Sequence, residues 1–99
     1  MEITRTNIGG TEVMSLTGRL DTVTSMKLQT VLTEAIEGAE KIELDFAAVD
    51  YVSSAGLRVL LQGQKAAQKA DKPITLKNVS SEVMEVFDVT GFSGILTII

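Results

Sequence analysis

Residues 51–61 read YVSSAGLRVLL and connect a predicted buried strand to a predicted helix. Ser53 and Ser54 stand where the loop becomes the helix, so either hydroxyl can cap the helix N-terminus. A phosphate on one of these serines would lie where free backbone N–H groups and the helix dipole favour negative charge. No other part of the chain concentrates comparable exposed chemistry, so the serine pair is the main candidate for a functional site.

The segments before the serine pair show the patterns of strands and turns. Gly9 and Gly10 predict a turn between two extended runs, which form a hairpin that stops at Gly18. Further along, Ile42, Leu44 and Phe46 alternate with polar residues and predict a strand with one apolar face. The predicted strands are Glu2–Thr6, Thr11–Thr17 and Lys41–Phe46, and the mixed apolar connection Ala47–Val52 then leads to the serines.

Three segments have capping residues and an apolar periodicity that predict helices. They run from the capping residues Asp21–Thr24 to Gly38, from Gly56 to Ala70, and from the cap Ser80 to Thr90–Gly91. The second helix has the broader apolar arc, so we expect it to be more buried than the first. Gly63 lies inside it although glycine costs about 1 kcal/mol relative to alanine there, which indicates close approach to a neighbouring element.

The order of these elements predicts the fold class. Two more strands, Ile74–Lys77 and Ile95–Ile99, complete the order β-β-α-β-α-β-α-β. Alternating strands and helices are typical of an α/β fold, here a small mixed sheet with parallel crossover units that is packed by α-helices. A chain of 99 residues can bury a single core, so we expect residues 1–99 to form one domain.

The composition disfavours several classes of function. The chain has no cysteine and no histidine, which removes disulfides, thiolate chemistry and the commonest general base and metal ligand. A net charge of -4 and few aromatic residues argue against direct nucleic-acid binding. The polar N-terminal segment and the lack of an apolar run of about 20 residues predict a cytoplasmic protein without a signal peptide or membrane contact.

The residues themselves give little support for catalysis. A nucleophilic serine needs an activating base, but no Ser-x-x-Lys spacing is present and Arg58, four residues after Ser54, stays protonated. Asp21, Asp45 and Asp50 could in principle form a Mg²⁺ site, but scattered acidic residues in loops are usually solvated or capping. From the pattern alone, an ordinary helix cap is the more frequent role of a serine pair in this position.

Four motifs in order resemble the STAS domain family, and within it the bacterial anti-sigma factor antagonists. The match runs along nearly the whole chain, and its third motif is the most specific. The motifs are Leu16–Asp21 (LTGRLD), Ile42–Phe46 (IELDF), Val52–Leu57 (VSSAGL) and Val86–Phe92 (VFDVTGF). The resemblance implies a small sheet packed by helices, with a regulatory serine at the N-terminus of the second helix.

The resemblance also carries over to single residues. The regulatory serine of the family lies two residues before a Gly-Leu pair, which places it at Ser54. Many members have aspartate just before it, where this chain has Ser53, so a second hydroxyl is open to a kinase. Arg58 stands where the family often has glycine, so the partner specificity is expected to differ. The residues implied at the partner contact are Asp21, Thr22, Val52, Ser53, Ser54, Ala55, Gly56 and Arg58, with exposed apolar residues of Ala47–Val52 as further candidates.

What the resemblance implies about function is a partner switch without catalysis by this chain and without a cofactor. Unmodified, the protein would bind an anti-sigma factor that is also a serine kinase of the histidine-kinase-like ATPase type, and this binding frees the sigma factor. Phosphorylation of Ser54 would end the complex, and a metal-dependent serine phosphatase would reset it. We expect a monomer. A non-enzymatic STAS scaffold, or an accessory subunit of a signalling or transport assembly, is an open alternative, and a small enzyme is a second one.

Overall fold

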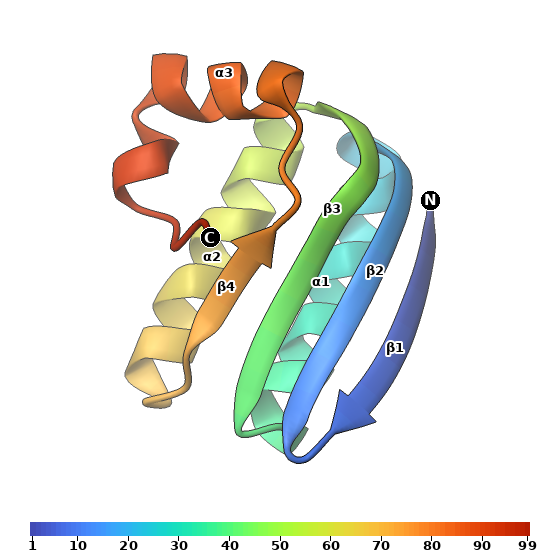
Figure 1. Cartoon of the computed structure of the whole chain (residues 1–99), viewed down its shortest axis with the longest axis vertical. Helices are drawn as coiled ribbons and strands as arrows, with labels where there is room; N and C mark the ends of the chain where they lie inside the picture. Colours follow the sequence, from blue (N-terminus) through green and yellow to red (C-terminus); the bar gives the residue numbers. More distant parts are fainter.

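The chain alternates strands and helices in the order that the sequence predicts, up to its last segment (Figure 1). The computed structural model describes all residues from 1 to 99. Its elements are β1 (Glu2–Ile8), β2 (Thr11–Leu20), α1 (Thr22–Gly38), β3 (Lys41–Val52), α2 (Ser54–Lys69), β4 (Ile74–Lys77), α3 (Ser81–Thr90) and a 3₁₀ turn, η1 (Phe92–Gly94).

The four strands form one mixed sheet in the spatial order β1-β2-β3-β4. Strands β1 and β2 form the predicted antiparallel hairpin, and its turn uses Gly9 and Gly10 at positive φ values of 58° and 89°. Strand β2 does not stop at Gly18 as predicted but continues to Leu20, because its last residues still pair with β3; Gly18 adopts a φ of 110° next to a register shift in this pairing. The β2–β3 and β3–β4 pairs are parallel, which confirms the predicted crossover units.

Strand β3 is longer than its sequence pattern predicts. It includes the segment Ala47–Val52, which was predicted to be a connection. The register between β2 and β3 shifts twice in this part, and each shift inserts one extra residue into β3. The buried residues are Ile42, Leu44, Phe46, Val49 and Val52, so their spacing changes from two to three after Phe46 and the alternation expected of a strand is lost.

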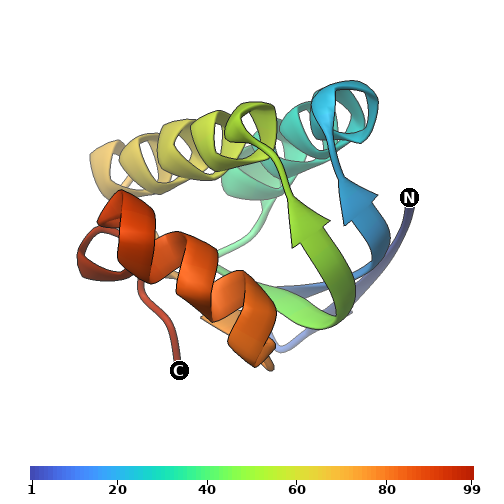
Figure 2. The same ribbon diagram turned by 90° about the horizontal axis from the view of Figure 1, so that it is seen from above.

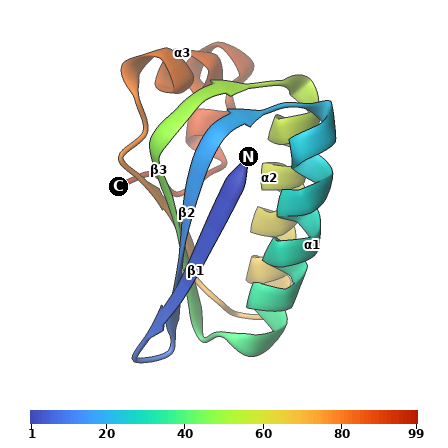
Figure 3. The same cartoon turned by 90° about the vertical axis from the view of Figure 1, so that its right-hand side faces the viewer.

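Helices α1 and α2 cover one face of the sheet, and α3 lies across the end of the sheet toward which β3 runs (Figure 3). The two long helices pack against each other at Gly63, as predicted, because a Cβ there would lie 2.3 Å from Cδ2 of Leu32. Helix α3 is joined to the sheet by an edge-to-face contact of Phe87 with Phe46, whose ring centroids are 6.3 Å apart. One apolar cluster therefore connects both long helices, α3 and the sheet.

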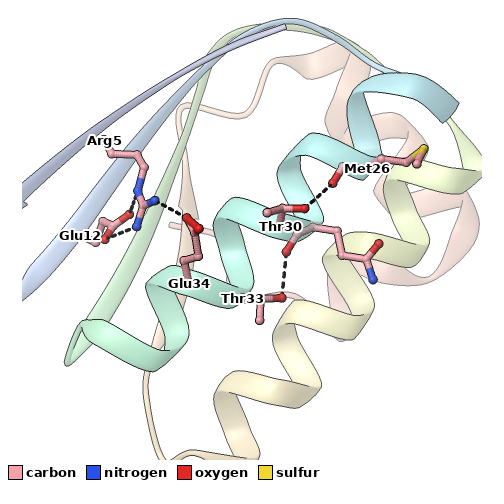
Figure 4. A network of polar contacts seen from close by, with 7 residues as sticks. Arg5, Glu12, Met26, Thr30, Thr33 and Glu34 are labelled. Carbon is pink, nitrogen blue, oxygen red and sulfur yellow. Dashed lines mark hydrogen bonds and ion pairs between the residues drawn. The ribbon is translucent and has the colours of Figure 1, made fainter.

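A polar contact on the covered side of the sheet links the hairpin to α1 (Figure 4). The guanidinium of Arg5 donates two hydrogen bonds to the carboxylate of Glu12, at 2.5 Å and 3.1 Å, and a third to Glu34 of α1 at 2.8 Å. These carboxylates raise the pKa of Arg5 above its ordinary value, the hydrogen bond from Glu12 having the largest effect. Glu12 is thereby buried with a bidentate partner.

The predicted last strand, Ile95–Ile99, is wrong. Helix α3 ends at Gly91 in the left-handed conformation, and the 3₁₀ turn that follows leaves only a few residues to reach the sheet. The backbone of Leu76 donates to the carbonyl of Thr97 at 2.8 Å and accepts from the N–H of Ile99 at 2.9 Å. This single bridge beside the short strand β4 is too little for a ladder, so the sheet has four strands.

Candidate functional site at the starts of the two long helices

The ends of β2 and β3 lie side by side because these strands are parallel. Leu20 pairs with Val52 at the last register position, and the N–H of Ser53 donates to the carbonyl of Leu20 at 2.8 Å. The helices that follow therefore start next to each other, as Figure 2 shows from above. The structure thus brings Asp21, which caps α1, beside the serine pair that opens α2.

Asp21 is held firmly by the first turn of α1. Its carboxylate accepts the backbone N–H groups of Val23 at 3.0 Å and of Thr24 at 2.9 Å, while the Thr24 hydroxyl accepts the N–H of Asp21 at 2.8 Å. This is a reciprocal capping box. The hydrogen bond from the Thr24 N–H is the largest cause that holds the pKa of Asp21 below its ordinary value, so the carboxylate is ionised at neutral pH.

The two serines have different roles in the helix start. Ser53 is the N-cap, and its half-buried hydroxyl accepts the N–H of Gly56 at 3.2 Å. Ser54 is the first helical residue; its side chain is exposed, and its hydroxyl makes no hydrogen bond within the chain. Helix α2 thus begins at Ser54, two residues before the predicted start. The Ser54 hydroxyl is the one that an incoming reactant can reach without breaking a contact.

Two residues that the sequence analysis placed at the partner contact are buried. Val52 is 5% exposed and belongs to the core. Gly56 is buried against the end of β2, and a Cβ there would lie 2.8 Å from Cγ and 3.0 Å from the carbonyl oxygen of Leu20. In this conformation both residues position the serine pair and present no side chain to a partner.

Three of the other predicted contact residues, Thr22, Ala55 and Arg58, line a shallow concavity between the helix starts. Its volume is about 340 Å³, and it is lined by Thr22, Ser25 and Met26 from α1 and by Ala55, Arg58 and Val59 from α2. Thr22 and Arg58 are exposed, and Ala55 is half-buried. The concavity near Ser54 therefore carries the hydroxyl groups of Thr22 and Ser25 and the guanidinium of Arg58.

Exposed apolar residues lie at this end of the molecule, one of them lining the concavity, and the sequence analysis missed two of them. Val23 is 76% exposed and Met26 is 68% exposed, both in the first turns of α1. Both residues are apolar but lie outside the apolar stripe of α1. An apolar residue outside the buried stripe of a helix was the sequence signal that could have identified them as exposed. In the segment before the serines, Tyr51 is 41% exposed and Arg19 stacks on its ring at 4.1 Å from the centroid.

The structure does not assemble a metal site. Asp21, Asp45 and Asp50 remain separate, and no group of three or more His, Cys, Asp or Glu side chains could hold a metal ion. The carboxylate of Asp45 instead accepts the N–H of Ala47 at 2.9 Å, which lowers its pKa below the ordinary value. No helix combines the length and the apolar character that crossing a membrane requires.

Comparison with known proteins agrees with the motifs. The family described as "Mlab, STAS domain" matches residues 4–97. This chain belongs to the STAS domain family. Among STAS proteins, BtrV of Bordetella bronchiseptica, which is named as an anti-sigma factor antagonist, is 30% identical over 99% of this chain and 85% of its own length. The anti-sigma-B factor antagonist of Staphylococcus epidermidis is 31% identical over 80% of this chain and 74% of its own length.

The STAS fold is also seen in solved structures. Unphosphorylated SpoIIAA, an anti-sigma factor antagonist, superposes with a TM-score of 0.83 at 20% identity, covering 99% of this chain and 88% of that one. SpoIIAA of Bacillus in its phosphorylated form gives 0.77 at 19% identity, with 99% and 91% covered. The resemblance to STAS proteins named anti-sigma factor antagonists is therefore confirmed in sequence, and the predicted α/β architecture is confirmed in structure.

Proposed function

We propose that this STAS protein is an anti-sigma factor antagonist that acts as a phosphorylation-controlled partner switch. Unmodified at Ser54, it binds an anti-sigma factor that is also a serine kinase of the histidine-kinase-like ATPase type, and so frees a sigma factor. The observation that carries the proposal is the exposed, unbonded hydroxyl of Ser54 on the first residue of α2. The names of the relatives, and the existence of SpoIIAA in two phosphorylation forms, support it.

The surface around Ser54 suits a protein partner. Exposed Met26 lines the concavity together with Thr22 and Arg58, and exposed Val23 lies three residues before Met26 on α1. Such a mixture of apolar and polar groups is typical of the contact area of protein complexes. Since the partner covers Ser54 in the complex, modification of that hydroxyl is felt directly at the interface. We propose that the protein binds as a monomer and contacts neither nucleic acid nor membrane.

The phosphoryl transfer assigns this chain the role of substrate. The Ser54 hydroxyl oxygen bonds to the γ-phosphorus of ATP held by the kinase, the bond from that phosphorus to the β–γ bridging oxygen breaks, and ADP leaves. The hydroxyl proton goes to a base of the kinase, because this chain has no histidine and the carboxylate of Asp21 is occupied by Val23 and Thr24. The reaction consumes ATP, so the proposal puts the protein in the cytoplasm.

The phosphate ends the complex through its charge. It adds about -1.5 to -2 charges at pH 7 to an interface built around a hydroxyl. A loss of about 3 kcal/mol in binding free energy weakens the complex more than 100-fold, which is enough for a switch. A metal-dependent serine phosphatase then uses water to return phosphoserine to serine and inorganic phosphate.

The test is a phosphorylation assay with matched serine variants. The purified protein is mixed with ATP, Mg²⁺ and candidate histidine-kinase-like anti-sigma factors from the same genome, and peptide mass spectrometry maps any added phosphate. We expect one phosphate on Ser54. Ser54→Ala should accept none and should bind the kinase constitutively.

Ser53→Asn is the matched control, because asparagine keeps the N-cap and removes the hydroxyl. This variant should be phosphorylated as the wild type is. Phosphate retained in Ser54→Ala and lost in Ser53→Asn would move the switch to Ser53. No phosphate with any candidate, on folded protein, would replace the switch by a constitutive STAS scaffold.

A further inference from the structure

Arg58 is a cation without a partner in the middle of the site. It is exposed on α2 and lines the concavity at the helix starts. The ion pairs of the structure join Arg5 to Glu12 and Glu34, and Lys77 to Glu43, so none of them involves Arg58.

The other cations at this end of the molecule are engaged. Arg19 stacks on Tyr51, and the ammonium of Lys27 donates to the carbonyl of Met1 at 3.2 Å. Arg58 is therefore the free guanidinium on this surface.

The position of Arg58 on the helix distinguishes between the two serines. Residues four apart on a helix lie on the same face, with Cβ atoms about 5–6 Å apart, and Arg58 is four residues after Ser54. Ser53 precedes the helix, and its hydroxyl is directed to the N–H of Gly56 as the cap. A phosphate attached to the Ser54 oxygen is thus within reach of the long side chain of Arg58. A phosphate attached to Ser53 would instead extend from the cap position, before the helical face that carries Arg58.

We propose that Arg58 binds the phosphate of phosphorylated Ser54 and so makes Ser54, not Ser53, the serine whose phosphate the fold accommodates. The proposal rests on the proposed function for the presence of that phosphate. A guanidinium presents its N–H donors in a planar fork that matches two phosphate oxygens, which a lysine ammonium does not reproduce.

The remaining charged groups near the site leave this pairing open. On the β2–α1 side, Asp21 is tied to backbone N–H groups and Arg19 to Tyr51. On β3, Asp50 is exposed and forms no ion pair. No carboxylate therefore competes for Arg58 within ion-pair distance.

The pairing changes what phosphorylation does to the surface. Before modification the start of α2 offers a single positive charge; afterwards the same patch carries about -0.5 to -1, because the phosphate both adds negative charge and occupies the cation. The sign of the local charge therefore reverses. A partner that relies on the free guanidinium loses it at the same time as it meets the phosphate.

The test measures the second ionisation of the phosphate without any kinase. Phosphoserine is installed at position 54 during translation by codon suppression, both in the wild type and in the Arg58→Gln variant. The ³¹P chemical shift of the phosphoserine is then followed against pH. Because a nearby cation favours the dianion, the pKa of the phosphate should be lower with Arg58 than with glutamine, by about half a pH unit. Relative to glutamine at position 58, lysine should lower the pKa of the phosphate by less than arginine does.

Phosphoserine at position 53 is the matched control. There, Arg58→Gln should leave the phosphate pKa unchanged within about 0.1 pH unit, a difference well below that expected for a direct ion pair. Equal pKa values at position 54 with arginine and glutamine would overturn the proposal, and so would an equal dependence on Arg58 at both positions. Circular dichroism checks that each variant is folded. Since the phosphate is installed directly, the result is independent of whether a kinase for Ser54 is found.

Discussion

The carboxylate of Asp21 illustrates how much of this site is set by single hydrogen bonds. It satisfies two N–H groups at the start of α1 that would otherwise lack a partner in the helix. These bonds lower the pKa of Asp21 in the folded state, so the stabilisation is complete above the unfolded value of about 4 and is lost as the pH falls through the lower folded value.

The variant Asp21→Asn isolates this effect. Asparagine caps a helix as well as aspartate does but does not titrate, so the extra stability of the wild type at neutral pH should decrease as the pH falls below about 4. Urea unfolding of both proteins between neutral and acidic pH measures the difference in free energy. The pKa of Asp45 is also lowered, but Asp45 titrates in both proteins, so its contribution cancels in the difference between their free energies of unfolding. A difference that is constant over this range would contradict the assignment.

The sequence located the caps but did not separate the roles of the two serines. Asp21 and Ser80 were predicted as caps and act as caps. At the serine pair, however, the cap and the first helical residue differ only in backbone rotation: Ser53 is extended with a ψ of 173° and Ser54 is already helical. Both positions accept serine, so the sequence pattern carries no information on which hydroxyl is occupied.

At the scale of elements, the contact between α1 and α2 depends on the absence of a side chain at Gly63. A Cβ there would lie 2.3 Å from Cδ2 and 3.3 Å from Cγ of Leu32, which is 2% exposed and surrounded by core residues. Alanine is the better helix former by about 1 kcal/mol, but overpacking at a buried contact costs about 1–3 kcal/mol. Leu32 and Gly63 line a concavity of about 140 Å³, which gives the Leu32 methyl some room, but the overlap at 2.3 Å is deep enough that the steric cost should exceed the gain in helix propensity.

We therefore expect Gly63→Ala to lower the free energy of unfolding by about 1–2 kcal/mol. Leu32→Val removes the methyl group that the new Cβ would meet, so it should be less destabilising in the Gly63→Ala background than in the wild type. Chemical denaturation of the four proteins of this double-mutant cycle measures the coupling. Additive effects of the two substitutions would show that the helices do not meet at this point.

The elements that the sequence predicted poorly share a physical cause. The second half of β3 was missed because two extra residues in its pairing with β2 change the spacing of buried positions from two to three, as at Val49 and Val52. The last strand was predicted at Ile95–Ile99, yet the tail pairs with the sheet only at Leu76. Pairing with another strand decides both cases, and local periodicity does not record it.

At the scale of the whole molecule, the candidate site lies at one end of the sheet, and the Ser54 hydroxyl is outside the core. The buried cluster holds the sheet and helices together without using Ser54. Ser54→Asp places a negative charge in the first turn of a helix, where it is favourable. We therefore expect the fold to tolerate a permanent charge at this position and the proposed partner interface not to.

We expect Ser54→Asp to melt within about 3 °C of the wild type, as for an exposed substitution with a small effect on stability. Its affinity for the anti-sigma factor should nevertheless fall by at least about tenfold, or about 1.4 kcal/mol. Differential scanning calorimetry and a direct binding titration give the two quantities. A large drop in melting temperature would attribute the loss of binding to unfolding and contradict the separation of fold and surface.

The bond from the N–H of Ser53 to the carbonyl of Leu20 has a consequence for how such proteins diversify. This main-chain bond helps to fix where Ser54 stands, and any residue except proline can form it at position 53. The exposed residues around it, Thr22, Val23, Met26 and Arg58, are then free to change without moving the serine. Under the proposed function, duplicated copies of the domain would differ in their recognition surface on an unchanged frame, and parallel partner switches would stay insulated from one another.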